Sequence, residues 1–172
     1  QITTRMPGLM VAEMVTVGVT EPAVRLRALG LPDDAPLLEL TPQRFQRVLA
    51  PKVAGAWNVH TQTRNDPVEH FLLFSSCAAV IGNPGQGNYV AANLFLDMLA
   101  HHRRALGLPA LAVDWGVVGD VGVVAARTAL ARHLENIGMI PLPAREMLDA
   151  LGVLFQTDTV QSTVLRADWS LV

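Results

Sequence analysis

The sequence is poor in several kinds of residue, and each shortage excludes a class of protein. Its 172 residues include one cysteine, so no disulfide can form within the chain, and a reducing, cytoplasmic setting is expected. Only 16% of the residues are charged and the net charge is −2, with no run of lysine or arginine, which argues against nucleic-acid binding. His60 and His70 are too far apart to suggest a metal site, so a metal-dependent hydrolase is a weak alternative.

No segment is suited to crossing a membrane or directing secretion. Residues 71–96 form the longest stretch without a charged side chain, but glycine, proline and asparagine fill its centre, which makes a membrane span too costly. Residues 1–5 have no long apolar segment behind a basic flank, so no signal peptide is expected. Because the chain begins at Gln1 rather than at methionine, we expect an excerpt of a longer polypeptide.

The rest of the sequence is organised around residues 71–97, FLLFSSCAAVIGNPGQGNYVAANLFLD. The apolar run that ends in Ser75 and Ser76 is typical of a strand buried on both faces of a parallel sheet. A loop rich in glycine follows, and then a helix that carries Tyr89 and Asn93 four residues apart on one face. Because ligands bind at the carboxyl ends of such strands, we expect Ser76, Tyr89 and Asn93 to converge on one crevice.

This group of residues needs a cation to act as a proton shuttle. A tyrosine phenol with an ordinary pKa near ~10 exchanges protons poorly at neutral pH, and a neighbouring ammonium favours the phenolate. Lys52 is the best candidate, because it lies on the predicted helix before the strand and the only lysine or arginine residues between Val48 and Leu96 are Lys52 and Arg64. Each of these residues alone is more often structural; their combination indicates a site.

A resemblance to a known family rests on four segments: LAPKVAGAWNVH, FLLFSS, GNPGQGNYVAANLFLDMLAHHRRALGLPA and VDWG. Together they resemble the ketoreductase domain of modular polyketide synthases, in the extended short-chain dehydrogenase/reductase superfamily, over residues 31–172. The usual short-chain enzyme has a lysine four residues after the tyrosine. Here Asn93 occupies that position and Lys52 comes from the preceding helix, as in the polyketide ketoreductases. The resemblance implies an α/β fold with a Rossmann-like parallel sheet and flanking helices.

The resemblance also implies roles for individual residues. Tyr89 would donate the proton, Ser76 would hydrogen-bond the substrate carbonyl, and Lys52 and Asn93 would complete the proton relay. Lys52, Tyr89 and Ser75 would contact the cofactor, NADPH. The implied reaction is the reduction of a β-ketoacyl chain on acyl carrier protein to a β-hydroxyacyl chain, within a multifunctional synthase that contains other domains.

The part of the family fold that holds the cofactor pyrophosphate is missing from the sequence. No GxGxxG turn, and no family variant of it, occurs before residue 80, and Gly18 stands where the family has an adenine-side aspartate. The first, second and fourth strands of the family are also missing. We therefore expect one truncated domain, residues 1–172, in which residues 1–30 are a remnant of the cofactor side and residues 31–172 the catalytic portion, with a lid at about 116–136.

Two interpretations of this truncated domain stay open. The chain could be the catalytic portion of a ketoreductase that is inactive in isolation. Alternatively, it could be a non-catalytic remnant that serves as a structural or interaction module. Binding of the cofactor pyrophosphate is the property that separates the two.

The resemblance also suggests the stereochemistry of the product. In the family, a tryptophan eight residues before the tyrosine marks one product class, and here that position is Ile81. The opposite class has Leu-Asp-Asp before the kinked helix, and here Pro32 precedes Asp33 and Asp34. With Gln86, these are the expected stereocontrol residues, and they resemble the B type, which gives a hydroxyl of D configuration. An ordinary acidic turn is the alternative for Asp33 and Asp34.

Hydrophobic periodicity and turn residues predict the other elements. Strands are predicted at residues 12–19, 71–76, 111–115 and 161–166, and helices at 22–29, 42–63, 88–105, 125–136 and from Leu142-Pro143 onward. Pro51 should kink or divide the helix at 42–63. One edge of the strand at 71–76 lacks its family neighbour, so we expect marginal stability and self-association there unless the strand at 12–19 pairs with it.

Overall fold

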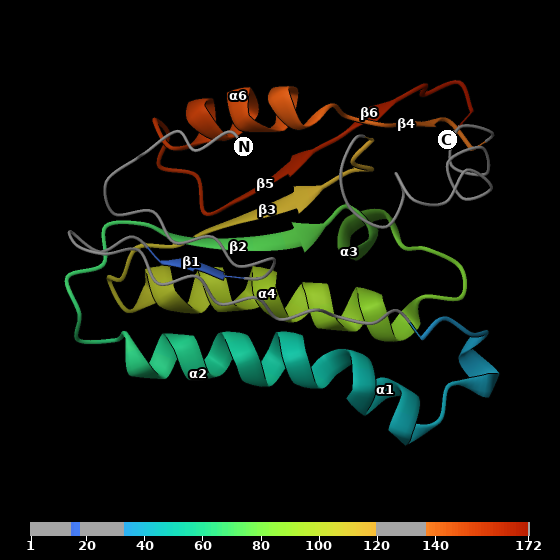
Figure 1. Cartoon of the computed structure of the whole chain (residues 1–172), viewed down its shortest axis with the longest axis horizontal. Helices are drawn as coiled ribbons and strands as arrows, with labels where there is room; N and C mark the ends of the chain where they lie inside the picture. The colour runs from blue at the N-terminus through green and yellow to red at the C-terminus, as the bar shows by residue number, and fades with distance from the viewer. Residues whose placement is uncertain (1–14, 18–32, 120–136, 172) are drawn as a thin grey trace.

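The computed structural model describes residues 15–17, 33–119 and 137–171. Within these residues the main sheet has the strand order β1-β2-β3-β5 (Figure 1). Its strands are β1 (Val15–Val17), β2 (Phe71–Ser76), β3 (Leu111–Trp115) and β5 (Gln161–Val164). β3 lies parallel to both β2 and β5, and β1 lies antiparallel to β2. The predicted α/β fold with a parallel sheet is confirmed.

Helices flank the sheet on both sides (Figure 1). One side has α1 (Pro42–Leu49), η2 (Ala50–Ala54), α2 (Gly55–Gln62) and α4 (Gly87–Ala105), and the other has α6 (Ala144–Leu154). The shorter elements are η1 (Leu37–Glu39), α3 (Ala78–Ile81) and an antiparallel pair of strands, β4 (Met139–Ile140) and β6 (Arg166–Ala167). The sequence did not predict α3. Among the described residues, no helix is long and apolar enough to span a bilayer.

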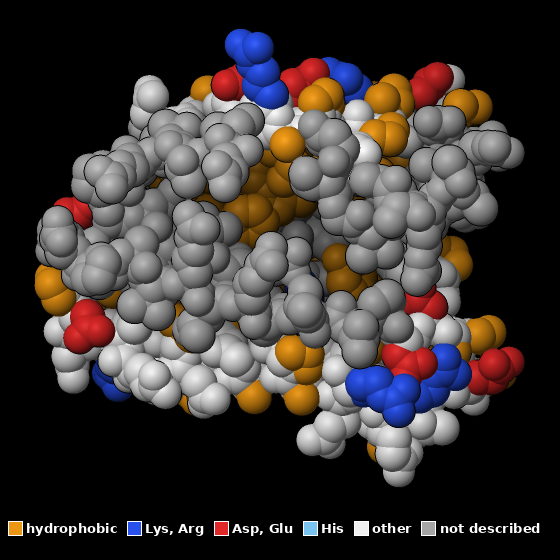
Figure 2. Space-filling view, in the orientation of Figure 1, with side chains coloured by type: hydrophobic (Ala, Val, Ile, Leu, Met, Phe, Trp, Pro, Cys, Tyr) orange, Lys and Arg blue, Asp and Glu red, His pale blue; other side chains and the backbone are white. Residues whose placement is uncertain are grey.

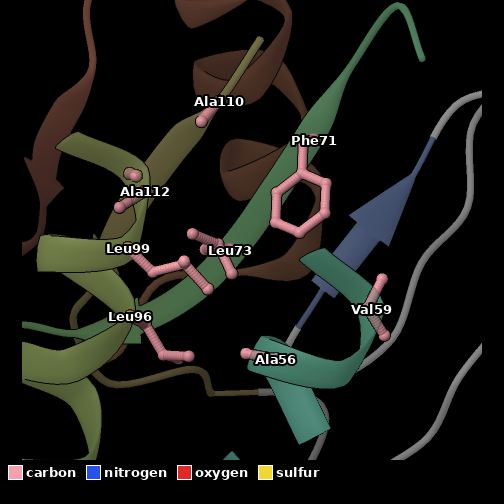
Figure 3. Packing of buried hydrophobic residues seen from close by; sticks show 9 residues of the cluster. Ala56, Val59, Phe71, Leu73, Leu96, Leu99, Ala110 and Ala112 are labelled. Carbon is pink, nitrogen blue, oxygen red and sulfur yellow. The ribbon is translucent and has the colours of Figure 1, made fainter. Parts of the chain in front are cut away.

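The alternation of side chains along β2 divides the hydrophobic core into two layers. Phe71 and Leu73 pack with α2, α4 and β3, as Figure 3 shows for the contact of Leu73 with Leu96 and Leu99. Leu72 packs in the second layer, which includes residues of β3 and α6. Burying a leucine or phenylalanine side chain contributes about 1.5–3 kcal/mol to folding. β2 therefore lies at the centre of the fold, buried on both faces as the sequence predicted.

Pro51 divides the predicted long helix, as expected. The π-helical segment η2 separates α1 from α2 and contains both Pro51 and Lys52. Proline has no N–H to donate to the carbonyl four residues earlier and its ring crowds that carbonyl, so a wider turn accommodates it. Lys52, the only lysine in the sequence, is buried at this point. The widened turn is thus the backbone feature that presents the lysine to the interior.

The expected open edge of β2 is paired over half of its length. β1 lies against it, with Val15 opposite Leu73 and Val17 opposite Phe71. The prediction of an unpaired edge is therefore wrong for residues 71–73, because the backbone of β1 supplies the missing hydrogen-bonding groups. Self-association through the rest of this edge stays a prediction, which sedimentation of the pure chain at low micromolar concentration would test; a monomer would contradict it.

A buried cation connects α4 with the sheet and with α2. The Arg103 guanidinium lies 3.6 Å from the centre of the Phe71 ring, and its Nε donates to the Pro109 carbonyl at 3.0 Å. Its Nη1 lies 3.1 Å from Nδ1 of His60, which is also buried. Burial lowers the pKa of Arg103 to about 10, and burial, followed by the charge of Arg103, lowers the pKa of His60. His60 is therefore a core residue.

Some predicted segments lie outside the described residues. These are the helices at 22–29 and 125–136 and most of the predicted lid at 116–136. The described start of that lid pairs with the chain just before α6: Val118 forms a β-bridge with Leu142, and the Gly119 amide donates to the Leu142 carbonyl at 3.0 Å. The first residues after β3 are thus fixed to a second segment.

Two carboxyl groups are buried between α4 and β3. Asp97 is 1% exposed and Asp114 is fully buried. Gln161 Nε2 and Thr163 Oγ1 donate to Asp114 Oδ2 at 2.9 and 3.1 Å, whereas neither oxygen of Asp97 has a hydrogen-bond partner among the described residues. Burial, together with the neighbouring Asp114 carboxyl, raises the pKa of Asp97 from 3.8 to about 7. Near neutral pH the Asp97 carboxyl is therefore partly protonated.

We predict that Asp97→Asn stabilises the chain more at high pH than at low pH. The stability contributed by the neutral Asp97 carboxyl is complete below its unfolded pKa near 3.8 and is lost as the pH rises through about 7. Asparagine does not titrate. The difference in Tm between Asp97→Asn and the unsubstituted chain should therefore increase by on the order of 5 °C between about pH 5 and about pH 8. Thermal unfolding at both pH values measures this difference.

The matched control is Asp149→Asn, an exposed aspartate on α6. Its effect on Tm should be small at both pH values, since an exposed carboxylate is already solvated. If Asp97→Asn changed Tm equally at the two pH values, the buried carboxyl would not be the titrating group.

Candidate functional site

The candidate site lies at the carboxyl end of β2, close to α3 and α4 (Figure 1). Ser75 continues the side of β2 that faces α4, and its Oγ donates to the Asn93 carbonyl at 3.3 Å. Ser76 comes next, and its Oγ accepts the amide of Ala78, the first residue of α3, at 3.3 Å. The two serines therefore point to different neighbours, Ser75 toward α4 and Ser76 toward α3.

Lys52, Asn93 and Tyr89 are brought together from η2 and α4. The Lys52 Nζ donates to Asn93 Oδ1 at 2.6 Å, and it lies 5.4 Å from the centre of the Tyr89 ring. The Asn93 Nδ2 donates to the Tyr89 carbonyl, one helical turn earlier, at 2.9 Å. Lys52 is 8% exposed and Asn93 is fully buried. The positions four residues apart on α4 thus share one face, as the spacing predicted.

Asn93 is the residue that joins this group. Its amide oxygen accepts from Lys52, its amide nitrogen donates within α4, and its backbone carbonyl accepts from Ser75. Since both ends of the amide are occupied, its orientation is fixed. A hydrogen bond from an ammonium is about twice as strong as a neutral one, and burial strengthens it further. A displacement of the Lys52 ammonium would therefore break this hydrogen bond.

The predicted stereocontrol residues form a second polar group. The Asp33 carboxylate accepts from Arg44 Nε at 2.8 Å and from Arg47 Nη1 at 2.7 Å. The Asp34 carboxylate accepts from Gln86 Nε2 at 2.9 Å, across 52 residues of sequence. In Figure 2 charged side chains gather over the region of α1 and η1, where these ion pairs lie. The acidic turn is therefore bound on one side by α1 and on the other by the glycine-rich loop.

The last predicted stereocontrol residue, Ile81, ends α3 and is 50% exposed, so it presents an apolar side chain to solvent. Cys77, which follows Ser76, is buried, and burial raises the pKa of its thiol. Cys77 is thus a small core residue rather than an activated nucleophile.

Reasoning from the sequence missed several residues that surround the site. Arg44 and Arg47 fix Asp33, Asn88 contacts the same turn, and Asp97 lies one turn beyond Asn93 on α4. Only Asp97 carried a usable signal, because its spacing from Asn93 places both on one helical face. Nothing in the sequence connected α1 with residues 33–34, since hydrogen bonds across loops leave no periodic pattern.

The donor set at this site suits the nicotinamide and ribose end of a dinucleotide. An ammonium (Lys52), two hydroxyls (Ser75 and Ser76) and a phenol (Tyr89) can bind ribose hydroxyls and a substrate carbonyl. The described residues contain no group of three or more His, Cys, Asp or Glu side chains that could hold a metal ion. The arrangement can therefore bind polar oxygen groups and transfer a proton from oxygen.

Comparison with known proteins agrees with this geometry. The model of the KR domain family matches residues 23–120. The chain is 39% identical over 166 residues to a phthioceranic/hydroxyphthioceranic acid synthase of Mycobacterium tuberculosis (strain ATCC 25618 / H37Rv), covering 93% of this chain and 8% of that protein. It is 43% identical over 136 residues to the polyketide synthase GfsB of Streptomyces halstedii, covering 78% of this chain and 2% of that protein.

Solved structures give the same assignment. An A-type ketoreductase from a modular polyketide synthase is 36% identical with a TM-score of 0.80, and covers 84% of this chain. The first ketoreductase of the tylosin polyketide synthase is 39% identical with a TM-score of 0.74, over 83% of this chain. This chain spans 30% and 31% of those two solved chains. The chain belongs to the KR domain family, the ketoreductase domains of polyketide synthases, which are oxidoreductases.

Proposed function

We propose that this chain is the catalytic portion of a ketoreductase domain that reduces a β-ketoacyl chain, carried on acyl carrier protein, to the β-hydroxyacyl chain. The observation that carries the proposal is the contact of Lys52 Nζ with Asn93 Oδ1 at 2.6 Å, beside the Tyr89 ring at 5.4 Å. A buried ammonium next to a phenol is the arrangement that proton donation from tyrosine requires. The curated relatives are polyketide and phthioceranic acid synthases of which this chain spans 2% and 8%, and this supports a role within a larger synthase.

A bound NADPH would supply the hydride that reduces the β-carbonyl carbon, and the carbonyl oxygen would take a proton. The Tyr89 hydroxyl donates that proton, while the Ser76 hydroxyl hydrogen-bonds the same oxygen as negative charge develops on it. Lys52, Tyr89 and Ser75 would hold the ribose side of the cofactor, and the hydrogen bond to Asn93 keeps the Lys52 ammonium in place. NADPH rather than NADH follows from the family resemblance alone.

The alternative is that the chain is a non-catalytic remnant that serves as a structural or interaction module. This alternative is favoured by the sequence before residue 80, which has no glycine-rich turn to hold a pyrophosphate. In that case the Lys52 and Asn93 contacts would persist only as core polar packing. Reduction by the chain joined to the cofactor-binding half of a similar ketoreductase distinguishes the two, because only the catalytic portion would become active there.

The stereochemical class is also part of the proposal. Ile81 in place of tryptophan and the acidic turn at Asp33 and Asp34 support the B type, with a product hydroxyl of D configuration. Chiral separation of the reduced product tests this class, and a product of L configuration would contradict it.

We predict that Tyr89→Phe abolishes nearly all reduction of a β-ketoacyl thioester. The activity is measured with the chain joined to the cofactor-binding half of a similar ketoreductase, by the loss of NADPH absorbance. Removing a general acid typically costs about 10²–10⁴-fold in rate. Ser170→Ala, which removes a hydroxyl from an exposed position, is the control and should leave the rate unchanged. Unchanged turnover of Tyr89→Phe would exclude it as the proton donor.

We predict that the isolated 172-residue chain does not bind NADPH tightly. Neither a glycine-rich turn nor the adenine-side aspartate is present in the sequence to hold the cofactor. Titration followed by nicotinamide fluorescence measures the affinity. Binding with a micromolar Kd would show that the chain holds the cofactor unaided, and the proposed inactivity of the isolated chain would then be wrong.

A further inference from the structure

Asn88 directly precedes Tyr89 and is fully buried, although its side chain is polar. Its Nδ2 donates to the backbone carbonyl of Asp33 at 2.9 Å, across 55 residues of sequence. Its Oδ1 accepts the backbone amide of Tyr89 at 2.8 Å. Both ends of this amide are thus committed to backbone groups, one on the acidic turn and one on the helix that carries the proton donor.

The start of α4 explains why the Oδ1 contact is needed. The first amides of a helix have no partner within the helix, and a side chain of the N-cap residue usually supplies one. Here the N-cap residue, Gln86, makes no such hydrogen bond to the helix. Asn88 satisfies the Tyr89 amide in its place, so its side chain is held by the first turn of α4 itself.

Two further contacts join the acidic turn to the same loop. The Ala35 amide donates to the Gly85 carbonyl at 2.8 Å, and Gln86 Nε2 donates to Asp34 Oδ2 at 2.9 Å. Gly85 has φ +78°, a conformation that other residues adopt only with strain. The Asn88 bond and the Ala35 bond each join a buried residue to a partly buried one, whereas Asp34 in the Gln86 bond is exposed. Water therefore competes less for the Asn88 and Ala35 contacts than for the Gln86 contact.

The carboxylates of the turn are already occupied by protein groups. Arg44 and Arg47 bind Asp33, and Gln86 binds Asp34. Neither side chain is therefore presented as a bare charge to a substrate. The turn is held between α1, whose Arg44 and Arg47 bind the Asp33 carboxylate, and the first turn of α4, whose Asn88 binds the Asp33 carbonyl.

We propose that Asn88 is a positioning residue: it fastens the acidic turn, residues 33–35, to the first turn of α4 and so sets which face of the substrate carbonyl meets Tyr89. This inference rests on the proposed ketoreductase function. It assigns the stereochemical influence of the turn to the position of its backbone rather than to the charge of its two aspartates.

The test uses Asn88→Asp, which keeps the acceptor for the Tyr89 amide and replaces the donor with an oxygen that faces the Asp33 carbonyl. A negative charge near a helix N-terminus is tolerated, so α4 should still form. Asn65→Asp, at an exposed position in a turn, is the matched control with the same chemical change. Hydrogen exchange of the Ala35 amide in the isolated chain reports whether the turn is attached, without any need for activity.

In the isolated chain, Asn88→Asp should accelerate exchange of the Ala35 amide by at least about tenfold, with Asn65→Asp unchanged. In the chain joined to the cofactor-binding half of a similar ketoreductase, Asn88→Asp should reduce the excess of one hydroxyl configuration and lower kcat, with the affinity for NADPH unchanged. Unchanged exchange, or faster exchange with the same product configuration and kcat, would overturn the inference. An inactive unsubstituted fusion would refute the proposed function instead, and the exchange result would still be readable.

If Asn88→Asp does not fold, two further variants test the same role of the acidic turn. Gln86→Glu places two carboxylates against each other at partly exposed positions, and it should shift the product configuration in the same direction. The double variant Asp34→Asn with Gln86→Glu reverses the donor and the acceptor, so it should restore the contact and the original product. Failure of the double variant to restore the product would overturn the role of the turn's position.

Discussion

The hydrogen bond between Lys52 and Asn93 is the interaction on which the candidate site depends. A buried ammonium must have partners, because leaving it without them in a low-dielectric interior costs several kcal/mol. Here the partner is an amide whose other end and backbone carbonyl are also bonded. Pro51 widens the helix within the same segment, η2. The local backbone therefore places the Lys52 side chain within hydrogen-bond distance of Asn93 on α4.

The sheet fixes where this interaction can form. β2 is buried on both faces, and its carboxyl end carries Ser75 toward α4. β3 pairs in parallel with one edge of β2, and β1 pairs antiparallel with the first half of the other edge. The strand that leads into the site therefore has a neighbouring strand on each side. Asp97 and Asp114 lie in the same layer, and the raised pKa of Asp97 follows from that burial.

The acidic turn illustrates how two different interpretations of a sequence motif can fit the same contacts. Asp33 and Asp34 do lie beside the glycine-rich loop, at the start of the helix that carries Tyr89. Their carboxylates, however, are bound by Arg44, Arg47 and Gln86. Two adjacent aspartates therefore fit an acidic turn that is held by ion pairs as well as a motif that guides a substrate, and their roles at the site stay predictions.

The sequence by itself determined the family, the parallel sheet around residues 71–76, the division of the helix at Pro51 and the shared face of Tyr89 and Asn93. These follow from local rules, since apolar runs, proline chemistry and helical spacing act between near neighbours. The tertiary structure alone decided that β1 pairs with β2, that Arg103 and Asp97 are buried, and that Asn88 reaches Asp33. Those contacts join segments far apart in the chain, and hydrogen bonds across such distances depend on the packed arrangement rather than on any periodicity of the sequence.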